Sequence, residues 1–308
     1  MGYEKQYLEI LNKLLTEGEY TEDRTGTGCY SIVGVPMEID LNEGFPLLTT
    51  KKMNYNNIVG ELLFFLSGSV TLESLRHYQD KEEGDHTIWT DDFEKYWKSR
   101  EEYFDDDESL PARALEHGGR IYSQQWRGFY SCGFDGYPAE HDQIVTLLDN
   151  IKSVKNGDNT MARRLIVTAW NPYDHTVGDK VVAALPACHT DFQVILRGDT
   201  LNLRFSCRSN DFLLGNPYNV ASYATLAHIL AKLTGYKVGK LYYYGTDVHL
   251  YSNHLGQAKR QLGREPYKPP TLLLPEFDSL ESLLELTASC FTLVDYEYHP
   301  FIKAPQAS

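Results

Sequence analysis

The chain has 308 residues, of which 42% are hydrophobic and 13% aromatic, and it carries a formal net charge of −14. This composition is typical of a folded globular protein and excludes a disordered chain. The negative charge disfavours nonspecific binding to nucleic acids or acidic membranes, since both need a basic surface. An anionic ligand would have to be held by a few focused arginines, against the field of the whole molecule.

The five cysteines are irregularly spaced, and the start of the chain does not resemble a secretory signal. We therefore expect free thiols in a reducing, cytoplasmic compartment. The cysteines and histidines lack the spacing of a zinc site, so no metal is expected. The longest apolar run, residues 58–66, is interrupted by Gly60 and Glu61 and is too short to span a membrane.

The first third of the chain predicts two helices and a strand. Residues 3–18 and 54–66 repeat apolar side chains at helical spacing, and residues 31–39 indicate a strand. The Gly- and Thr-rich residues 23–28 indicate a turn before that strand. Residues 98–118 are acidic and weakly patterned, so we interpret them as a surface insertion rather than a linker between domains.

The rest of the chain mixes both kinds of element. Helices are expected at residues 143–154 and 219–233, and strands at residues 165–170, 192–196, 201–207 and 241–244. The two middle strands form a hairpin across a Gly-Asp turn, and the second of them alternates apolar and polar side chains between its faces. The sequence contains no repeat, low-complexity stretch or Pro/Gly linker, so we expect a single domain over residues 1–308.

Cys188 is the candidate nucleophile. A cysteine thiolate is strongly nucleophilic where its pKa is lowered and it is partly exposed. Pro186 restrains the backbone before it, and His189 follows it. Neighbouring side chains on a strand point apart, so this adjacency alone does not make a catalytic pair. The alternative is that Cys188 is a small buried hydrophobe.

Glu61 is a candidate for proton transfer. It lies one helical turn from Ile58 and Phe65, on or beside the apolar face of its helix. A carboxyl in that place is desolvated, which raises its pKa and suits it to proton transfer near neutral pH. The alternative is a boundary glutamate paired with a lysine or arginine.

Arginines suggest an anion site. Arg24 lies in the Gly/Thr turn, Arg208 precedes Ser209, and Arg163 and Arg164 are adjacent at the start of a strand. Guanidinium groups match the geometry of phosphate, and a serine adds a hydroxyl. Four arginines around one dianion would offset the net charge of −14. The alternative for any one of them is an ordinary surface arginine.

Three polar residues suit a pyrimidine nucleotide. The Asn219 amide can donate to a ring carbonyl and accept from the adjacent ring N–H, which accepts uracil, whereas cytosine would favour aspartate. The alternative for Asn219 is a helix N-cap. His249 and Tyr251 point the same way in an extended chain, toward one sugar hydroxyl, or they are ordinary half-buried strand residues. Trp89 and Tyr122 are stacking surfaces or core, with core as the default.

The informative residues form an ordered series of motifs along nearly the whole chain. They are Asp23-Arg24-Thr25-Gly26-Thr27-Gly28, Glu61-Leu62-Leu63, Ile88-Trp89, Gln125-Trp126-Arg127, Arg163-Arg164, Ala169-Trp170-Asn171-Pro172, Leu185-Pro186-Ala187-Cys188-His189, Arg208-Ser209 and His249-Leu250-Tyr251-Ser252-Asn253-His254. Together these motifs closely resemble the folate-dependent, non-flavin thymidylate synthase family. Chance coincidence of so many ordered motifs is negligible.

The resemblance implies an α+β fold, with a mixed sheet and flanking helices, in a homodimer whose sheets pack face to face. It implies a methyltransferase of dTMP biosynthesis that converts dUMP to dTMP and needs no metal. The one-carbon and hydride donor would be 5,10-methylenetetrahydrofolate, and Cys188 would add to C6 of uracil. Arg163 and Arg164 would complete the phosphate site of the partner. Neither a membrane nor a nucleic acid is expected as a partner.

The resemblance also implies roles for individual residues. The catalytic residues would be Cys188, Glu61, Tyr122, Asn219 and Arg208. The dUMP-binding residues would be Arg24, Arg163, Arg164, His189, Arg208, Ser209, Asn210, Asp211, Asn219, His249 and Tyr251. The folate-binding residues would be Lys51, Trp89, Asp211, Gly215 and Ala307.

Several positions depart from the usual motifs of the family. Cys207 stands where Gln usually precedes Arg-Ser, and Arg120 replaces a usual Pro. The segment after Trp89 reads Thr90-Asp91-Asp92, where a second Trp is frequent. Residues 173–183 look longer than in compact members, and the polar end at Ser308 replaces an aliphatic one. Most of these changes fall on the folate side or at the closing tail. They motivate an alternative, a dUMP hydroxymethylase in which water replaces hydride.

Two further classes of function fit the sequence less well. A non-catalytic nucleotide-binding protein would not need the thiol of Cys188, and the intact Glu61, Tyr122 and Asn219 argue against it. A Cys-His thiol hydrolase would leave the arginines unexplained, and the sequence offers no evident partner to orient His189.

Overall fold

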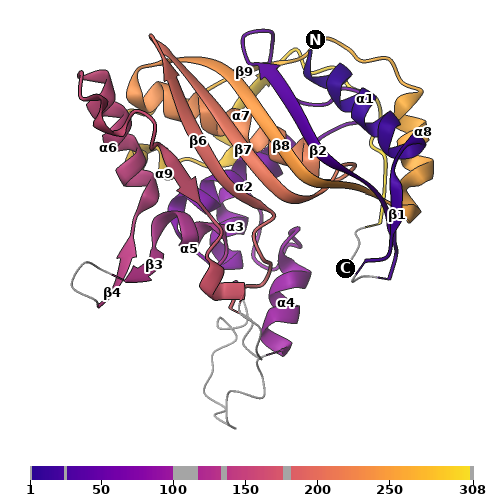
Figure 1. Ribbon diagram of the computed structural model, residues 1–308, viewed down its shortest axis with the longest axis horizontal. Coiled ribbons are helices and arrows are strands. Elements are labelled where there is room, and N and C mark those ends of the chain that lie inside the picture. The colour runs from indigo at the N-terminus through magenta and orange to yellow at the C-terminus, as the bar shows by residue number, and fades with distance from the viewer. Residues whose placement is uncertain (1, 24–25, 100–116, 133–136, 176–181, 306–308) are drawn as a thin grey trace.

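The computed structural model describes residues 2–23, 26–99, 117–132, 137–175 and 182–305 (Figure 1). Its helices are α1 (Tyr3–Thr16), α2 (Tyr55–Ser67), α3 (Leu72–Tyr78), α4 (Thr90–Lys98), α5 (Tyr122–Arg127), α6 (Gln143–Lys155), α7 (Gly215–Thr234), α8 (Leu255–Leu262) and α9 (Leu280–Leu284). Its strands are β1 (Glu19–Thr21), β2 (Cys29–Asp40), β3 (Phe129–Cys132), β4 (Pro138–His141), β5 (Ile166–Thr168), β6 (His189–Arg197), β7 (Thr200–Asp211), β8 (Lys237–Tyr251), β9 (Thr271–Leu273) and β10 (Thr292–Val294). Most of the expected insertion at residues 98–118 lies outside the described residues.

A six-stranded sheet in the order β1-β2-β8-β7-β6-β5 forms the centre of the molecule. Neighbouring strands run antiparallel except β7 and β8, which are parallel. Parallel neighbours need a long crossover connection, and the 20-residue helix α7 supplies it. In Figure 1, helices α2 and α7 lie behind the sheet, and α7 packs against β7 and β8. The fold is therefore α+β with a mixed sheet and flanking helices, as expected.

The two faces of the sheet differ in chemistry. The alternation predicted for β7 is confirmed, because four of its residues are fully buried: Leu201, Leu203, Phe205 and Cys207. The Phe205 ring stacks on Tyr223 of α7, with centroids 4.2 Å apart and planes 14° apart. On the other face, Arg204 of β7 and Asp191 of β6 form an ion pair at 2.5 Å. One face therefore builds the core, and the other carries polar pairs.

Helix α2 carries one charged residue, Glu61, into the core. Asn54 caps the helix by accepting a hydrogen bond from the Asn57 amide at 3.2 Å. Gly68 ends it with a left-handed φ of 78°. The helix contacts α3, α5 and α7, so most of its surface is covered. A polar side chain on such a helix loses much of its hydration.

Helix α7 begins earlier than expected. It starts at Gly215, so Asn219 lies inside the helix and the N-cap alternative for Asn219 is wrong. Pro217 suggested a boundary, but a proline is tolerated in the first turn because the first N–H groups of a helix have no intrahelical acceptor.

Strand β8 extends well beyond the expected residues 241–244. Its 15 residues run to Tyr251, so His249 and Tyr251 do lie on one strand. Pairing with β2 on one side and β7 on the other keeps the segment after Tyr244 extended. A Cβ at Gly245 would meet the Tyr243 hydroxyl at 2.2 Å, so the close packing requires glycine here.

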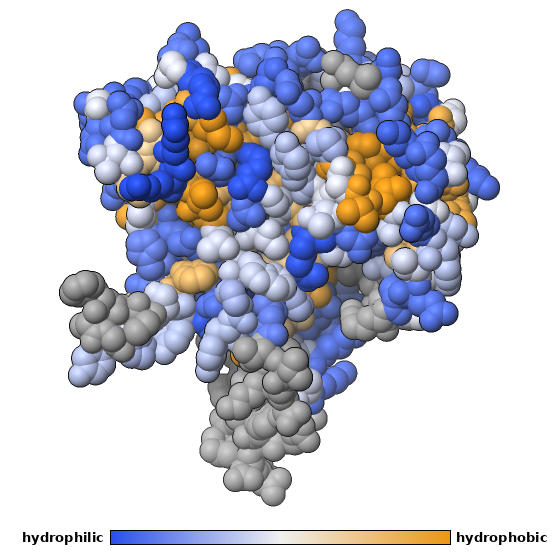
Figure 2. Space-filling model, viewed as in Figure 1, coloured by the Kyte–Doolittle hydropathy of each residue, from blue (hydrophilic) through white to orange (hydrophobic). Residues whose placement is uncertain are grey.

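A single hydrophobic cluster runs from Tyr3 to Phe291, and all nine helices named above contribute to it. Apolar residues are also exposed on three strands of the sheet: Val33, Ile166 and Tyr244 are 81%, 48% and 53% exposed. Figure 2 shows separate apolar patches among hydrophilic side chains on the face seen in Figure 1. Among the described helices, none has both the length and the apolar character needed to cross a membrane.

Leu226→Ala tests the burial of α7. Leu226 is fully buried on this helix, so its truncation leaves a cavity. We expect the free energy of unfolding to fall by about 2–5 kcal/mol, measured by urea denaturation. The control is Val145→Ala on α6, where the side chain is 39% exposed and the expected change is about 0.5 kcal/mol or less. Equal losses in the two variants would contradict this packing.

Candidate active site

The carboxyl ends of the parallel strands β7 and β8 bring several of the predicted residues together. Ser209 pairs with Asp247, and Asp211 pairs with His249. The N-terminal end of α7 follows β7 directly, at Gly215. Ligands of α/β sheets bind outside the carboxyl ends of parallel strands, and helix N-termini favour anions. This edge of the sheet is therefore the candidate site.

Cys188 enters the site from the segment before β6. Its amide donates to Tyr122 Oη at 2.7 Å, and the His189 amide donates to the same oxygen at 3.3 Å. The Arg208 Nη2 lies 3.9 Å from the Cys188 sulfur, and Arg208 Nε donates to the Ala187 carbonyl at 2.8 Å. A tyrosine on one side and an arginine on the other thus fix the half-buried thiol.

Opposing effects set the acidity of this thiol. Burial raises the pKa of Cys188, the Arg208 guanidinium lowers it, and the carboxylate of Asp92 raises it. Arg208 is thus the group that favours the thiolate, which is the nucleophilic form.

The contacts of His189 do not suit it to act as a base for Cys188. Its Nδ1 lies 2.8 Å from Tyr223 Oη, and its ring stacks on Tyr122 with centroids 3.9 Å apart. Burial lowers the pKa of His189 to about 3, so the imidazole is neutral at physiological pH. These contacts give no support to a Cys-His hydrolase.

Glu61 has the environment that its helix position predicts. Its Oε1 accepts a hydrogen bond from Trp89 Nε1 at 2.6 Å. Burial raises the pKa of Glu61 to about 7, although the hydrogen bond from Trp89 lowers it. The carboxyl can therefore both hold and release a proton near neutral pH.

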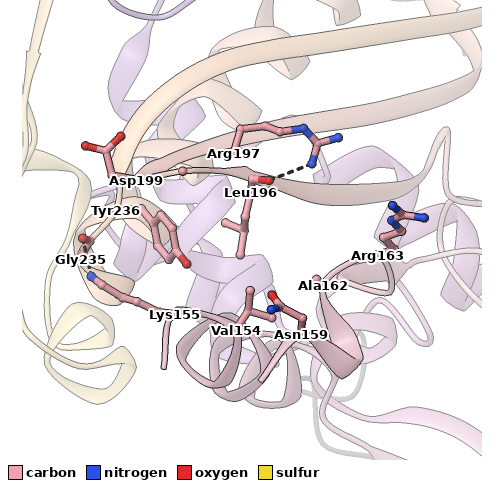
Figure 3. Close-up of a pocket in the computed structure, with 11 residues that line it drawn as sticks. Val154, Lys155, Asn159, Ala162, Arg163, Leu196, Arg197, Asp199, Gly235 and Tyr236 are labelled. Carbon is pink, nitrogen blue, oxygen red and sulfur yellow. Dashed lines mark hydrogen bonds between the residues drawn. The ribbon is translucent and has the colours of Figure 1, made fainter. Parts of the chain in front are cut away.

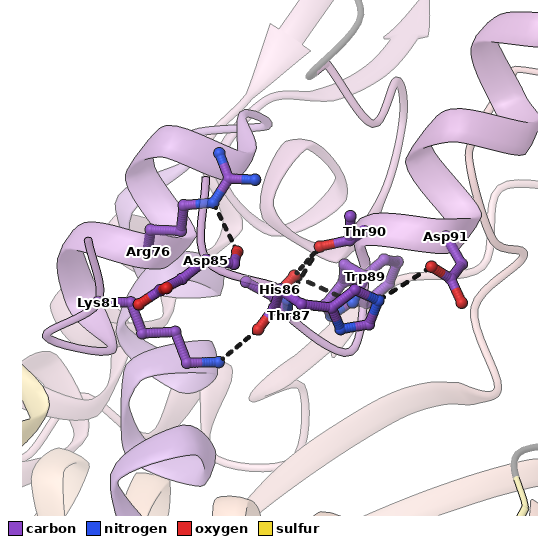
Figure 4. A network of polar contacts seen from close by, with 8 residues as sticks. All are labelled: Arg76, Lys81, Asp85, His86, Thr87, Trp89, Thr90 and Asp91. Carbon is purple, nitrogen blue, oxygen red and sulfur yellow. Dashed lines mark hydrogen bonds and ion pairs between the residues drawn. The ribbon is translucent and has the colours of Figure 1, made fainter. Parts of the chain in front are cut away.

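A network of hydrogen bonds surrounds the segment before α4 that carries Trp89 (Figure 4). The Trp89 amide donates to Thr87 Oγ1 at 3.2 Å. Lys81 Nζ donates to the His86 carbonyl at 3.0 Å, and Arg76 Nε donates to the Asp85 carbonyl at 2.9 Å. These bonds to backbone carbonyls hold the segment that carries the indole.

The last two residues of β7, Asn210 and Asp211, make internal hydrogen bonds. The Asn210 Oδ1 accepts from Asn216 Nδ2 at 2.9 Å and from Tyr243 Oη at 2.8 Å, and Asn210 is buried. The Asp211 Oδ1 accepts from the amides of Leu213 and Leu214, at 3.0 and 3.1 Å. Both side chains shape the turn that leads into α7.

The remaining nucleotide-side residues occupy α7 and β8. Asn219 is half-buried, and its Nδ2 lies 3.9 Å from the sulfur of Cys207. The rings of His249 and Tyr251 lie 5.2 Å apart, as expected for side chains two residues apart on a strand. Burial raises the pKa of Tyr251 to about 12, so its hydroxyl keeps its proton.

Lys51 is more deeply buried than its predicted role suggests. Its Nζ donates to the Leu213 carbonyl, and the side chain is 3% exposed. Burial lowers the pKa of Lys51 to about 8, against an opposing effect of Asp211. The ammonium group therefore anchors the turn before α7 in this structure.

Arg163 and Arg164 are exposed on the turn before β5. Arg163 borders a pocket of about 460 Å³ that Lys155 and Arg197 also line, and Cys188 does not (Figure 3). Within one copy, the structure does not bring these two arginines to the thiol. Arg24 and Ala307 lie outside the described residues.

Three residues near the thiol were not among the predicted site residues. Asp92 acts on the Cys188 charge, Cys207 contacts Asn219, and Trp170 lies beside Arg208, 5.2 Å from ring centroid to guanidinium carbon. Asp92 and Cys207 stand out in the sequence as departures from the family motifs. Within the described part of the chain, no cluster of three or more His, Cys, Asp or Glu residues has a metal-binding arrangement.

Comparisons with known proteins show the family of this chain. The family model for thymidylate synthase matches residues 5–308. A protein of Escherichia phage T5 named "Probable thymidylate synthase" is 40% identical over 310 residues, covering 99% of this chain and all of that protein. These findings identify the chain as a methyltransferase of dTMP biosynthesis. It belongs to the thymidylate synthase family.

Trp89→Phe tests the control of the Glu61 carboxyl. The hydrogen bond from the indole stabilises the charged carboxylate, so its loss raises the pKa of Glu61 above about 7. Carbon-13 NMR titration of labelled glutamate carboxyls measures this, with Glu61→Gln to assign the signal. The control Trp97→Phe removes an indole donor to the His117 carbonyl and leaves the pKa unchanged. A lower or unaltered pKa of Glu61 in Trp89→Phe would contradict the assignment.

Proposed function

We propose that this enzyme converts dUMP to dTMP by reductive methylation, with 5,10-methylenetetrahydrofolate as the donor, and that Cys188 attacks C6 of uracil. The strongest support is the arrangement around one thiol. Arg208 lies 3.9 Å from its sulfur, and Tyr122 accepts hydrogen bonds from the amides of Cys188 and His189. This addition needs a nucleophile, a cation that favours the thiolate and a hydroxyl group in a fixed position.

The phosphate of dUMP binds to arginines in this proposal. Arg208 and Ser209 at the end of β7 contribute to it, and Arg24 would add a further guanidinium. Arg163 and Arg164 of a second copy complete it, since both are exposed and the pocket that Arg163 borders does not include Cys188. Focused guanidinium groups would hold the dianion although the protein carries a net charge of −14.

The nucleoside is held by α7 and β8. The Asn219 amide reads the uracil edge, and His249 with Tyr251 binds the 3′ hydroxyl. His189 and Asn210 act by holding their surroundings, because His189 Nδ1 lies 2.8 Å from Tyr223 Oη and Asn210 Oδ1 accepts a hydrogen bond from Asn216 Nδ2. A fixed neutral imidazole beside Tyr122 keeps an additional charge away from the base.

The chemistry begins with the Cys188 thiolate forming a bond to C6, which moves electron density to C5 and O4. Asn219 stabilises the charge that develops on O4. The cosubstrate supplies the one-carbon unit and the hydride. Glu61, with a pKa of about 7, and Tyr122 manage removal of the proton from C5.

The folate side comprises Lys51, Trp89, Asp211, Gly215 and Ala307. Asp211 suits the donor-rich edge of a pterin, because both amides that bind it converge on Oδ1 and no hydrogen bond among the described residues involves Oδ2. Trp89 offers an aromatic wall whose N–H is bound by Glu61. Contact between Lys51 and the glutamate tail requires its ammonium to leave the Leu213 carbonyl.

A homodimer packed through the sheet faces accounts for the exposed apolar residues of the sheet. Val33, Ile166 and Tyr244 lie on strands that such a dimer would cover. The same packing would bring the turn of Arg163 and Arg164 toward the site of the partner. We place the enzyme in the cytoplasm, where the free thiols Cys29, Cys188, Cys207 and Cys290 stay reduced.

One observation favours the alternative product, 5-hydroxymethyl-dUMP. Asp92 is a half-buried carboxylate on the first turn of α4, close enough to act on the charge of Cys188. A carboxylate in the segment where the family frequently has a second tryptophan would admit water, which competes with hydride for the exocyclic methylene on the nucleotide.

A single incubation with dUMP and 5,10-methylenetetrahydrofolate separates the two products. Dihydrofolate absorbance rising in step with dTMP, identified by mass spectrometry, would support methylation. A hydroxymethylated nucleotide formed without dihydrofolate would establish the alternative. No nucleotide product would reject both.

Cys188→Ser tests the nucleophile. A serine hydroxyl is far less acidic than a thiol, so we expect the rate of product formation to fall by at least about a thousandfold. The control is Cys290→Ser, because Cys290 is exposed and lies about a hundred residues after Cys188 in the sequence. We expect this variant to have an activity close to that of the unmodified enzyme. Retained activity in Cys188→Ser would show that another group attacks the base.

Asn219→Asp tests the reading of the base. Aspartate replaces an amide donor by an acceptor, which suits the exocyclic amine of cytosine and opposes O4 of uracil. We expect the ratio of kcat/KM for dCMP to that for dUMP to rise by about tenfold or more. Asn156→Asp, exposed at the end of α6, serves as the control. An unchanged ratio would mean that Asn219 does not contact the base edge.

A further inference from the structure

The indole of Trp170 links Arg208 to a short helix outside the site described above. The guanidinium carbon of Arg208 lies 5.2 Å from the centroid of the Trp170 ring. The imidazole of His175 stacks on the same indole, with centroids 3.8 Å apart and planes 20° apart. His175 ends a 3-10 helix, Pro172–His175, in the segment that departs in length from the family. One aromatic ring therefore contacts both the arginine and this histidine.

Hydrogen bonds hold this short helix in place. The side chain of Asp174 is 3% exposed, and its carboxylate binds Arg120 Nη1 at 2.5 Å and Gln125 Nε2 at 2.7 Å. The Asp174 amide donates to the Asn171 carbonyl at 3.0 Å, and Asn171 Nδ2 donates to the Tyr130 carbonyl at 3.2 Å. A residue between such anchors and the indole has little freedom to move.

The groups around His175 favour the neutral form of its imidazole. Burial lowers the pKa of its imidazole, Asp174 beside it raises that pKa, and Arg208 lowers it. Arg120 faces the group through its ion pair with Asp174. The lowered pKa favours the neutral imidazole, which adds no repulsion to Arg208.

We propose that His175 is a positioning residue, which through the indole of Trp170 holds the Arg208 guanidinium beside the Cys188 sulfur. Arg208 also contacts the Ala187 carbonyl at 2.8 Å, the Pro186 carbonyl at 3.4 Å and Cys188 Sγ at 3.9 Å. The Trp170 backbone is itself held, since its amide donates to Thr168 Oγ1 at 3.2 Å. Stacking by His175 fixes the plane of the indole, and the face of the indole fixes the guanidinium.

The test is the reactivity of Cys188 toward iodoacetamide, followed by peptide mass spectrometry, between about pH 6 and pH 10. In His175→Ala the indole loses its stacking partner and Arg208 stabilises the thiolate less. We expect the apparent pKa of Cys188 to rise and its alkylation rate near neutral pH to fall by about threefold. His175→Phe keeps a ring against the indole and restores the rate to within about twofold of the unmodified enzyme.

His299→Ala is the matched control, because His299 also stacks on an aromatic ring, that of Tyr267, with centroids 4.8 Å apart. This variant leaves the pKa of Cys188 unchanged. Thermal unfolding of each variant identifies any loss of folded protein. The proposal would be overturned if Cys188 had the same pKa in His175→Ala as in the unmodified enzyme. It would also be overturned if His175→Phe lowered the alkylation rate as much as His175→Ala does.

The assay does not depend on the substrate, so its outcome is separate from that of the proposed function. If dUMP is the substrate, His175→Ala also raises KM for dUMP, because Arg208 then binds the phosphate less well. If the unmodified enzyme does not turn over dUMP, the proposed function fails while the alkylation result still decides the role of His175.

Discussion

The parallel pairing of β7 with β8 is the constraint on which the site depends. Parallel neighbours require a crossover, and α7 provides it, so the N-terminal end of α7 meets the carboxyl ends of both strands. Arg208 and Ser209 on β7, Asn219 on α7 and His249 on β8 share one edge of the sheet for this reason. Antiparallel pairing of the same two strands would send these residues to opposite ends.

Burial sets the chemistry of the side chains that this topology gathers. The same desolvation raises the pKa of Glu61 to about 7 and lowers that of His189 to about 3. The carboxyl becomes able to exchange protons at neutral pH, whereas the imidazole stays neutral. Burial also raises the pKa of Cys188, so the thiolate depends on the guanidinium of Arg208. An arginine held in one place matters more in such a site than it would in water.

Aromatic packing supplies the required rigidity. The Phe65 ring lies 4.9 Å from Tyr122 and 6.1 Å from Trp89, centroid to centroid, so α2 connects the hydroxyl that holds Cys188 to the indole that binds Glu61. Trp170 and His175 play a similar part beside Arg208. Rings with few rotatable bonds can fix polar groups at a small entropic cost.

The sequence by itself determined the local elements and the family. Alternation in residues 201–207 predicted the buried face of β7, and helical spacing predicted α1 and α2, because these patterns follow from the geometry of one chain segment. It did not predict the start of α7 or the length of β8, since a proline in a first turn and a glycine inside a paired strand are accepted only in their tertiary setting. Tertiary structure alone decided that Lys51 binds the Leu213 carbonyl, that Cys207 contacts Asn219 and that His175 stacks beside Arg208. Such contacts join residues far apart in the chain, and no periodicity in a sequence records them.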